Sequence, residues 1–299
     1  MYRLVFSLLS VVIISCSTKQ RVKPDATKPN IIYILADDLG YGDLSCYGQT
    51  RFSTPNIDKL AKEGMLFTQH YAGSTVCAPS RSALMTGLHT GNTPIRGNKK
   101  IELPNDNFTV AELLKENGYT TGGFGKWGLG SSGFEGDPLN QGFDTFFGFH
   151  DQMLAHHYYP NYLWDNDKVF NLVENEGLKK GQYAPSLIHQ RALSFIDNHK
   201  NEPFFLYYPS IIPHAELFAP EEYMNRFIGK FNPEKSFDGV DDGALYKTGR
   251  YGSQKNGHAA FVAMITLLDD QVGEIVQKVK DLGLEENTII IFTSDNGPH

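Results

Sequence analysis

Cysteine is scarce in this chain, which has three in 299 residues, an odd number. The count and the wide spacing do not match the paired framework that stabilises small secreted domains, so we predict no disulfide framework and expect Cys46 to be a small buried apolar residue. Long apolar runs are also lacking, since none beyond the first residues could cross a membrane as a helix. With 40% apolar content, the chain instead has enough material for one large α/β core.

Positive charge is also in short supply. The chain has 27 Lys and Arg against 34 Asp and Glu, which gives a formal net charge of −7 and a pI near 5.8. A nucleic-acid-binding protein normally presents a basic face that neutralises phosphates, so we expect no nucleic-acid partner. The sequence also lacks internal repeats and low-complexity tracts. Its acidic clusters are therefore either solvated surface groups or ligands of a cation.

Residues 1–16 have the pattern of an export signal. Arg3 precedes an apolar stretch that is too short for a membrane-spanning helix, and Cys16 ends the segment. The four residues ending at Cys16 resemble a bacterial lipobox, which implies lipidation of this cysteine; the alternative is an ordinary secretory signal cleaved nearby. Residues 17–29, rich in Lys and Pro, would form a tether. We expect an exported periplasmic or outer-membrane lipoprotein that meets the membrane only through its lipid anchor.

Continuous apolar runs rich in β-branched and aromatic residues indicate strands buried on both faces of a parallel sheet. Such runs cover residues 30–36, 204–208 and 288–293, and another strand begins within residues 119–122. Helical segments lie between these runs. The alternation predicts an α/β fold, and we assign residues 30–299 to one catalytic domain.

Capping residues mark the helix boundaries. Thr54 and Pro55 open a helix that Gly64 ends, and Thr109 with Glu112 forms a capping box at the start of another. Further helices are predicted over residues 185–199 and 258–282. The long segments over residues 130–181 and 213–257 show no clean periodicity, and we interpret them as ordered insertions that wall a pocket.

Acidic residues follow two apolar strands that lie far apart in the sequence. Asp37 and Asp38 come directly after the first strand, and Asp295 and Asn296 follow the last. The carboxyl edge of an open α/β sheet is where ligands bind. A set of oxygen ligands suits Ca²⁺, with Mg²⁺ as the alternative, and does not suit zinc. Taken singly, each of these residues is a common turn or cap residue, so the prediction depends on the pair of sites.

The most specific motif is Cys-Ala-Pro-Ser-Arg-Ser-Ala-Leu-Met-Thr-Gly over residues 77–87, which resembles the C-x-P-S-R-x-x-L-x-T-G signature of type I sulfatases. The resemblance implies an alkaline-phosphatase-like sandwich with a large, mostly parallel central sheet flanked by helices. It also implies that a maturation enzyme oxidises Cys77 to formylglycine, whose hydrate is the nucleophile. The residues themselves agree, because Pro79 suits a first helical turn and Gly87 a helix end, which places Cys77 at the positive end of a short helix.

The resemblance extends to other residues of the site. Arg81, one helical turn beyond Cys77, would hold the formylglycine hydroxyl and a sulfate oxygen. Lys126 corresponds to a sulfate-binding lysine, but Gly128 stands where much of the family has a histidine that helps to expel sulfate. His214 matches the histidine that binds sulfate and protonates the leaving alcohol. The metal ligands that the resemblance implies are Asp37, Asp38, Cys77, Asp295 and Asn296. Asp295 would also take the proton from the nucleophile.

Other polar residues are weaker candidates for substrate binding. His156 and His157, in His-His-Tyr-Tyr, would line the pocket or replace the histidine missing at Gly128, and the alternative is a structural role. Arg96, with Asn98 close by, would reach the same pocket or be merely solvated.

The expected activity is hydrolysis of a sulfate monoester on a carbohydrate. The Gly-Lys-Trp-Gly-Leu-Gly and His-His-Tyr-Tyr segments look like those of enzymes that remove 4-O-sulfate from galactose or N-acetylgalactosamine. The alternatives are a phosphonate or phosphate ester hydrolase with the same nucleophile motif, and a non-catalytic glycan-binding lipoprotein. Members of the family continue past the Asp-Asn-Gly that stands here at residues 295–297, with a sulfate-binding lysine and a C-terminal subdomain. We therefore expect this chain to be truncated and to lack that subdomain.

Overall fold

A seven-stranded sheet forms the centre of the computed structural model, which describes residues 28–298. The strand order is β5-β4-β3-β2-β6-β1-β7. Strands β3, β2, β6, β1 and β7 run parallel, and β4 and β5 extend one edge in antiparallel fashion. The strands are β1 Asn30–Ala36, β2 Thr120–Lys126, β3 Thr145–Phe149, β4 Tyr162–Asp165, β5 Lys168–Asn171, β6 Phe204–Pro209 and β7 Thr288–Ser294.

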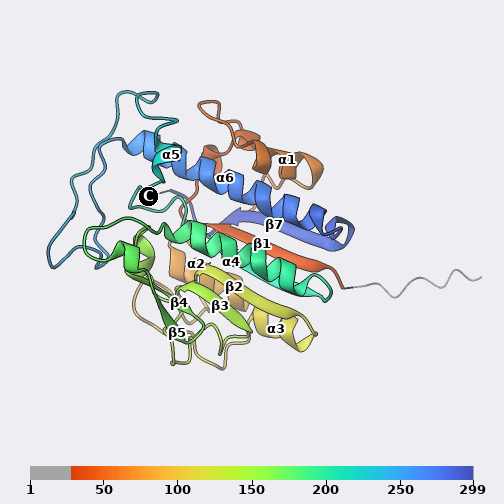
Figure 1. Cartoon of the computed structure of the whole chain (residues 1–299). Helices are drawn as coiled ribbons and strands as arrows, with labels where there is room; N and C mark the ends of the chain where they lie inside the picture. The colour runs from red at the N-terminus through yellow and green to blue at the C-terminus, as the bar shows by residue number, and fades with distance from the viewer. Residues whose placement is uncertain (1–27, 299) are drawn as a thin grey trace, which may run out of the picture.

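Helices cover both faces of this sheet, and Figure 1 shows α4 and α6 lying across the face nearer the viewer. The helices are α1 Pro55–Glu63, α2 Cys77–Thr86, α3 Val110–Glu116, α4 Ala184–His199, α5 Glu221–Met224 and α6 Gly257–Asp281. Short 3₁₀ turns cover Tyr41–Asp43, Ser45–Tyr47, Leu154–His156, Val173–Asn175 and Glu285–Asn287. No helix between residues 28 and 298 is both long and apolar enough to cross a membrane.

Side-chain alternation along the central strands divides the core into two layers. Ile32 and Ile34 of β1 are fully buried in the layer that also contains residues of α4 and α6. Phe205 and Tyr207 of β6 point the other way, into the layer formed with α2 and α3. Parallel strands buried on both faces need apolar side chains on both, which is why their sequences are continuous apolar runs.

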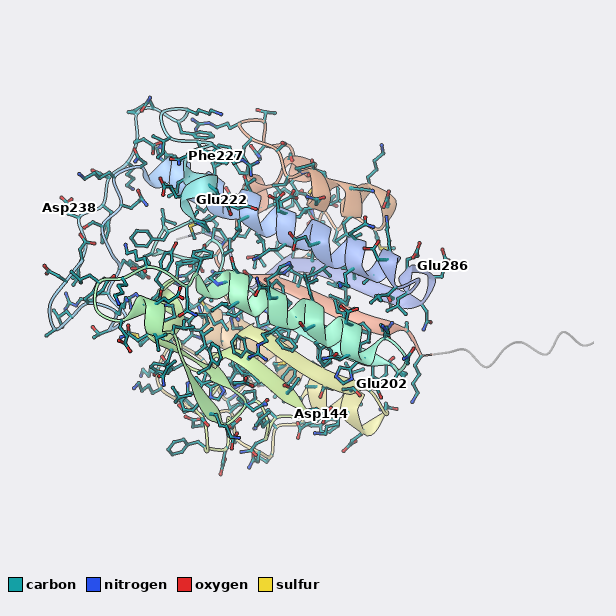
Figure 2. The ribbon with its side chains drawn as sticks, viewed as in Figure 1. Asp144, Glu202, Glu222, Phe227, Asp238 and Glu286 are labelled. Carbon is teal, nitrogen blue, oxygen red and sulfur yellow. The ribbon has the colours of Figure 1, made fainter. Side chains whose placement is uncertain are left out.

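The parallel strands all end at the same edge of the sheet. Glu202 and Glu286, which lie two residues before β6 and β7, are toward the right of Figure 2. Asp238, in the long segment between β6 and α6, lies at the far left. Residues that follow the strands are therefore gathered at the end of the sheet near this segment.

The predicted α/β fold with a large, mostly parallel central sheet is confirmed, and the predicted helices and strands are found within a few residues of their expected ends. One prediction about burial is wrong. Residues 288–293 were expected to be buried on both faces, but Ile289 is 48% exposed and Ile291 is 38% exposed. The reason is topological, because β7 lies at the edge of the sheet and pairs only with β1 among the described strands.

The segment over residues 130–181 is more regular than the sequence suggests, since it contains β3, β4 and β5. Cys46 is half-buried rather than fully buried, Cys77 is buried, and both thiols are free. The predicted signal, Cys16 and most of the predicted tether lie outside the described residues.

Candidate active site

Four neighbouring strands deliver polar residues to the carboxyl edge of the sheet. Asp37 and Asp38 follow β1, Asp295 follows β7, Lys126 ends β2, and His214 comes shortly after β6. Backbone pairing continues past the strand ends, because Asp37 N–H donates to the Ile212 carbonyl at 3.0 Å and Asp295 N–H donates to the Ala36 carbonyl at 3.0 Å. These bonds fix the acidic residues relative to one another.

Cys77 occupies the first turn of α2 and faces the carboxylate of Asp38, with 3.8 Å between Sγ and Oδ1. Val76 before the helix is extended, and Gly87 ends the helix in the left-handed region with φ of 67°. Burial, reinforced by the charge of Asp37, raises the pKa of the Cys77 thiol well above its ordinary value. The unmodified thiol therefore stays protonated and is a poor nucleophile at neutral pH.

Arg81 lies one helical turn beyond Cys77 and is completely buried. Its Nε and Nη2 donate to Oδ2 of Asp295 at 3.0 and 2.8 Å, and Nη2 lies 3.4 Å from Oδ1 of Asp37. Its Nη1 donates to the Lys126 carbonyl. The guanidinium thus connects three strand ends to the helix that carries Cys77.

Lys126 is also fully buried, and its Nζ donates to Oδ2 of Asp37 at 2.7 Å. Burial acts to raise the pKa of Asp37, but Lys126 and Arg81 outweigh it and hold that pKa well below the ordinary range. Burial, followed by repulsion from Asp37, raises the pKa of Asp295 to about 7. The pKa of Asp37 therefore lies well below that of Asp295, although both carboxyl groups contact Arg81.

The carboxylate and amide oxygens of the site fit a hard cation, whereas the thiol of Cys77 and the ring of His214, which lie among them, are softer ligands. One ligand atom from each of Asp37, Asp38, Cys77 and His214 lies within 4.8 Å of the others. Oδ1 of Asp37 and Oδ1 of Asn296 are buried and accept no hydrogen bond. Buried carboxylate and amide oxygens without hydrogen bonds are costly unless a cation binds them, and oxygen donors suit Ca²⁺.

The structure brings the predicted metal ligands together, with differences of detail. Asn296 Nδ2 donates to Oδ1 of Asp38, and Asp38 N–H donates to Oδ1 of Asp295 at 3.2 Å. The other carboxylate oxygen of Asp295 accepts a hydrogen bond from Arg81. His214, which the sequence analysis predicts to bind the substrate, lies beside Asp37 and Asp38. The ligand set inferred from the sequence remains a prediction.

His214 is held against the acidic cluster by its backbone and its ring. The Tyr158 hydroxyl bonds the carbonyls of Ile211 and His214 at 2.7 and 2.8 Å. Nε2 of His214 lies 3.4 Å from Oδ2 of Asp38. Burial acts to lower the pKa of His214, and the charges of Asp37 and Asp38 act in the opposite direction.

The weaker candidates separate in the structure. His156 stacks on His214, with ring centroids 4.9 Å apart and planes 15° from parallel. His157 is buried, and its Nε2 accepts a hydrogen bond from the N–H of Gly249 at 2.8 Å. Arg96 is exposed and donates from Nε to the Thr93 carbonyl at 3.1 Å, so the structure does not bring it into this cluster.

Two residues near the site escaped the sequence analysis. The ring of Tyr251 lies edge-on to those of His156 and His214, with centroids 5.3 and 6.1 Å away. The amide of Gln152 lies where a side chain on Gly128 would go, since a Cβ there would be 2.4 Å from Nε2. Both residues fall in the long insertions, where no local motif marks them.

Asn98 has a local role beside the nucleophile. Its Oδ1 accepts a hydrogen bond from the N–H of Ala78 at 3.1 Å, which satisfies one of the unpaired amides in the first turn of α2. This contact helps to fix the turn that carries Cys77.

Known proteins are similar to this chain over 90% or more of its length. The chain is 32% identical over 357 aligned residues to an N-acetylgalactosamine-6-O-sulfatase of Bacteroides thetaiotaomicron, which covers 97% of this chain and 64% of the relative. It is 33% identical over 293 residues to the N-acetylgalactosamine-6-sulfatase of Rattus norvegicus, covering 90% and 50%. The chain thus spans between half and two thirds of the length of these curated relatives.

A solved structure shares both fold and sequence. Ps i-CgsB superposes with a TM-score of 0.72 at 32% identity, covering 91% of this chain and 59% of the other, and it has also been crystallised with k-i-k-neocarrahexaose. A sequence model described as Sulfatase matches residues 29–299. The Cys77 motif, the acidic strand ends and these similarities lead to one conclusion: the chain belongs to the sulfatase family.

Proposed function

We propose that the whole protein hydrolyses sulfate monoesters on carbohydrates, with a formylglycine made from Cys77 beside a calcium ion. The observation that carries the proposal is the position of Cys77, buried in the first turn of α2 beside Asp38 and on the same helix as Arg81. The protonated thiol is a poor nucleophile there. A hydrated aldehyde at this position would instead supply a hydroxyl for attack on sulfur and a second hydroxyl whose deprotonation releases sulfate.

The surrounding residues have distinct roles in this proposal. Asp37, Asp38, Asp295 and Asn296 would hold the cation, which would stabilise negative charge on the reacting oxygens. Lys126 and Arg81 provide buried positive charge beside that position. In the same proposal Asp295 accepts a proton from the nucleophile.

His214 is the candidate for protonating the oxygen of the leaving alcohol. Its carbonyl accepts a hydrogen bond from Tyr158, and its ring packs against His156. These contacts orient the ring before a substrate arrives, which is the arrangement that proton transfer requires.

The proposed substrates are O-sulfated galactose or N-acetylgalactosamine. The two relatives from Bacteroides thetaiotaomicron and Rattus norvegicus are N-acetylgalactosamine 6-sulfatases, whereas Gly-Lys-Trp-Gly-Leu-Gly with His-His-Tyr-Tyr indicates a 4-O-sulfate. Sulfate release by the full-length protein, matured in a competent host, should be measured on both isomers. Release from neither, or from no sulfated sugar tested, would reject the proposal.

Two further measurements separate the alternatives. Mass spectrometry of the peptide that contains Cys77 should show a residue lighter than cysteine by the change from thiol to aldehyde, and a Cys77→Ala variant is the inactive control. An unmodified thiol in the native host would favour the non-catalytic glycan-binding protein. Faster cleavage of a matched phosphate ester than of the sulfate ester would favour the phosphoryl hydrolase.

We also propose that the protein is exported and anchored by a lipid on Cys16. Support comes from the apolar stretch before Cys16 and the lipobox-like residues that end there. Incorporation of a labelled fatty acid should occur in the wild type and not in Cys16→Ser. Equal labelling of both proteins would reject the anchor.

A further inference from the structure

Two adjacent histidines, His156 and His157, form hydrogen bonds with the two backbone polar groups of Gly249. Nδ1 of His156 is 3.0 Å from the carbonyl oxygen of Gly249, and the N–H of Gly249 donates to Nε2 of His157 at 2.8 Å. Gly249 has a φ of 101°, and a Cβ there would lie 2.2 Å from Cε of Met153. This backbone conformation favours glycine, and the two hydrogen bonds join the two long insertions at this residue.

These bonds give the two rings opposite tautomers. The carbonyl of Gly249 can only accept, so Nδ1 of His156 carries the hydrogen and Nε2 of the neutral ring has a free lone pair. His157 accepts at Nε2, so its hydrogen is on Nδ1, which lies 3.4 Å from Oε1 of Glu216. The other carboxylate oxygen of Glu216 accepts from Gly252 N–H at 2.7 Å, which fixes this end of the network.

The two rings also differ in location. His157 is 1% exposed, whereas His156 is only half-buried and stacks on His214, with Tyr251 edge-on to both rings. The lone pair on Nε2 of His156 is therefore available beside the residue that we assign to leaving-group protonation.

We propose that Nε2 of His156 accepts a hydrogen bond from a hydroxyl group next to the sulfate ester of the substrate, and so determines substrate specificity. A lone pair repels the oxygens of sulfate, which are themselves acceptors, so its partner must be a donor, and hydroxyls beside the ester are the donors of a sugar. His157 is a positioning residue that acts on His156 through Gly249. This inference rests on the proposed carbohydrate sulfatase function.

Two substitutions separate the two nitrogens of His156. His156→Asn keeps a donor near the position of Nδ1 and removes the acceptor at Nε2, whereas His156→Gln places an amide near Nε2. Binding should be measured by calorimetry in the full-length Cys77→Ala protein, which does not depend on turnover. The ligands are a sulfated galactoside and analogues in which each hydroxyl next to the sulfate is replaced by hydrogen.

The expected result is a loss of discrimination between ligands. His156→Asn should weaken binding of the hydroxylated ligand about 10-fold or more and leave one deoxy analogue unchanged, and His156→Gln should restore much of the difference. His157→Phe should also reduce the difference in affinity between the hydroxylated ligand and that deoxy analogue, as His156→Asn does. The matched control is His189→Asn, because His189 is a buried histidine on α4 that contacts Glu274 at 2.7 Å, away from the site.

Three results would overturn the inference. They are equal weakening for the hydroxylated and every deoxy ligand, unchanged binding in His156→Asn, or the same change in the His189→Asn control. Failure of the proposed function has a different signature, since the protein with Cys77 intact would then release no sulfate from any sulfated sugar tested.

Discussion

Arg81 joins carboxylates that lie far apart in the sequence, Asp37 after β1 and Asp295 after β7. All three side chains are almost completely excluded from solvent. A buried ion pair adds little net stability over an apolar replacement, but removing one partner leaves an uncompensated charge. At the residue scale, the site is therefore a set of groups that tolerate substitution only together.

Replacing Arg81 by methionine should test this dependence. Arg81→Met keeps most of the side-chain volume but leaves Asp295 and Asp37 without their shared partner, so we expect a loss of about 3–5 kcal/mol in the free energy of unfolding. Urea denaturation of the full-length protein measures the loss. Lys59→Met is the control, since Lys59 and Glu63 are both more than half exposed, and it should change stability by less than about 0.5 kcal/mol.

His150 should make stability depend on pH. Its ring is buried against Trp164, with centroids 4.8 Å apart, neither nitrogen has a hydrogen bond, and burial lowers the pKa to about 4. The unfolded chain takes up the proton near pH 6.5, so this contribution is fully present above that pH and is lost as the pH falls toward 4. At pH 5 the loss should be roughly 2 kcal/mol.

Urea denaturation at several pH values checks this prediction. His150→Phe should flatten the dependence between pH 4 and 6.5, because phenylalanine packs on Trp164 without a titrating group. An unchanged slope in His150→Phe would show that other groups dominate this range.

At the scale of single elements, the capping box predicted for α3 is confirmed. Oγ1 of Thr109 accepts from Glu112 N–H at 3.1 Å, and the Glu112 carboxylate accepts from Thr109 N–H at 2.7 Å. Thr109 also donates to the Gln141 carbonyl at 2.8 Å, so the cap connects α3 to the segment before β3.

Thr109→Ala should therefore destabilise the protein by about 1–2 kcal/mol, through the lost cap and the unsatisfied Gln141 carbonyl. Thermal denaturation compared with Ser194→Ala tests this. Ser194 is exposed on α4 and bonds only its own helix at the Gln190 carbonyl, so its substitution should cost less than about 0.5 kcal/mol. Equal effects of the two substitutions would contradict the assigned role of the cap.

The elements that the sequence analysis missed are short and depend on partners. β4 and β5 have four residues each and form an antiparallel pair around Asn166, which has a φ of 56°. The turn Asp165-Asn166-Asp167 between Tyr-Leu-Trp and Lys-Val-Phe is a local hairpin signal in the sequence. Strands β1 and β6 were predictable because burial on both faces requires long apolar runs, whereas β3, with five residues inside the segment 130–181, was also missed.

The site was only partly predictable, because local spacing relates some of its residues and long-range contacts relate the others. Cys77 and Arg81 lie on one helical turn, so local spacing already relates them. The difference between His156 and His157 depends on Gly249, more than 90 residues away in sequence, and no local pattern reports that contact.

At the scale of the whole molecule, the exposed edge of the sheet should control association. Ile289 and Ile291 leave β7 with an apolar face, and exposed apolar edge strands pair with other chains. The 299-residue chain should therefore self-associate at high concentration, and Ile291→Lys should reduce this. Light scattering measures the change, with Leu178→Lys, at an exposed position outside the strands, as control. A chain that stays monomeric without the substitution would contradict this.

The buried charges around Cys77 have a consequence for the choice of substrate. When ionised, Asp37, Asp38 and Asp295 outnumber Arg81 and Lys126 by one negative charge, and a divalent cation would reverse that sign. A sulfate monoester carries one negative charge and would make the loaded site neutral, whereas a phosphate monoester near neutral pH carries almost two. Electroneutrality, rather than size or shape, would then separate these two nearly isosteric esters.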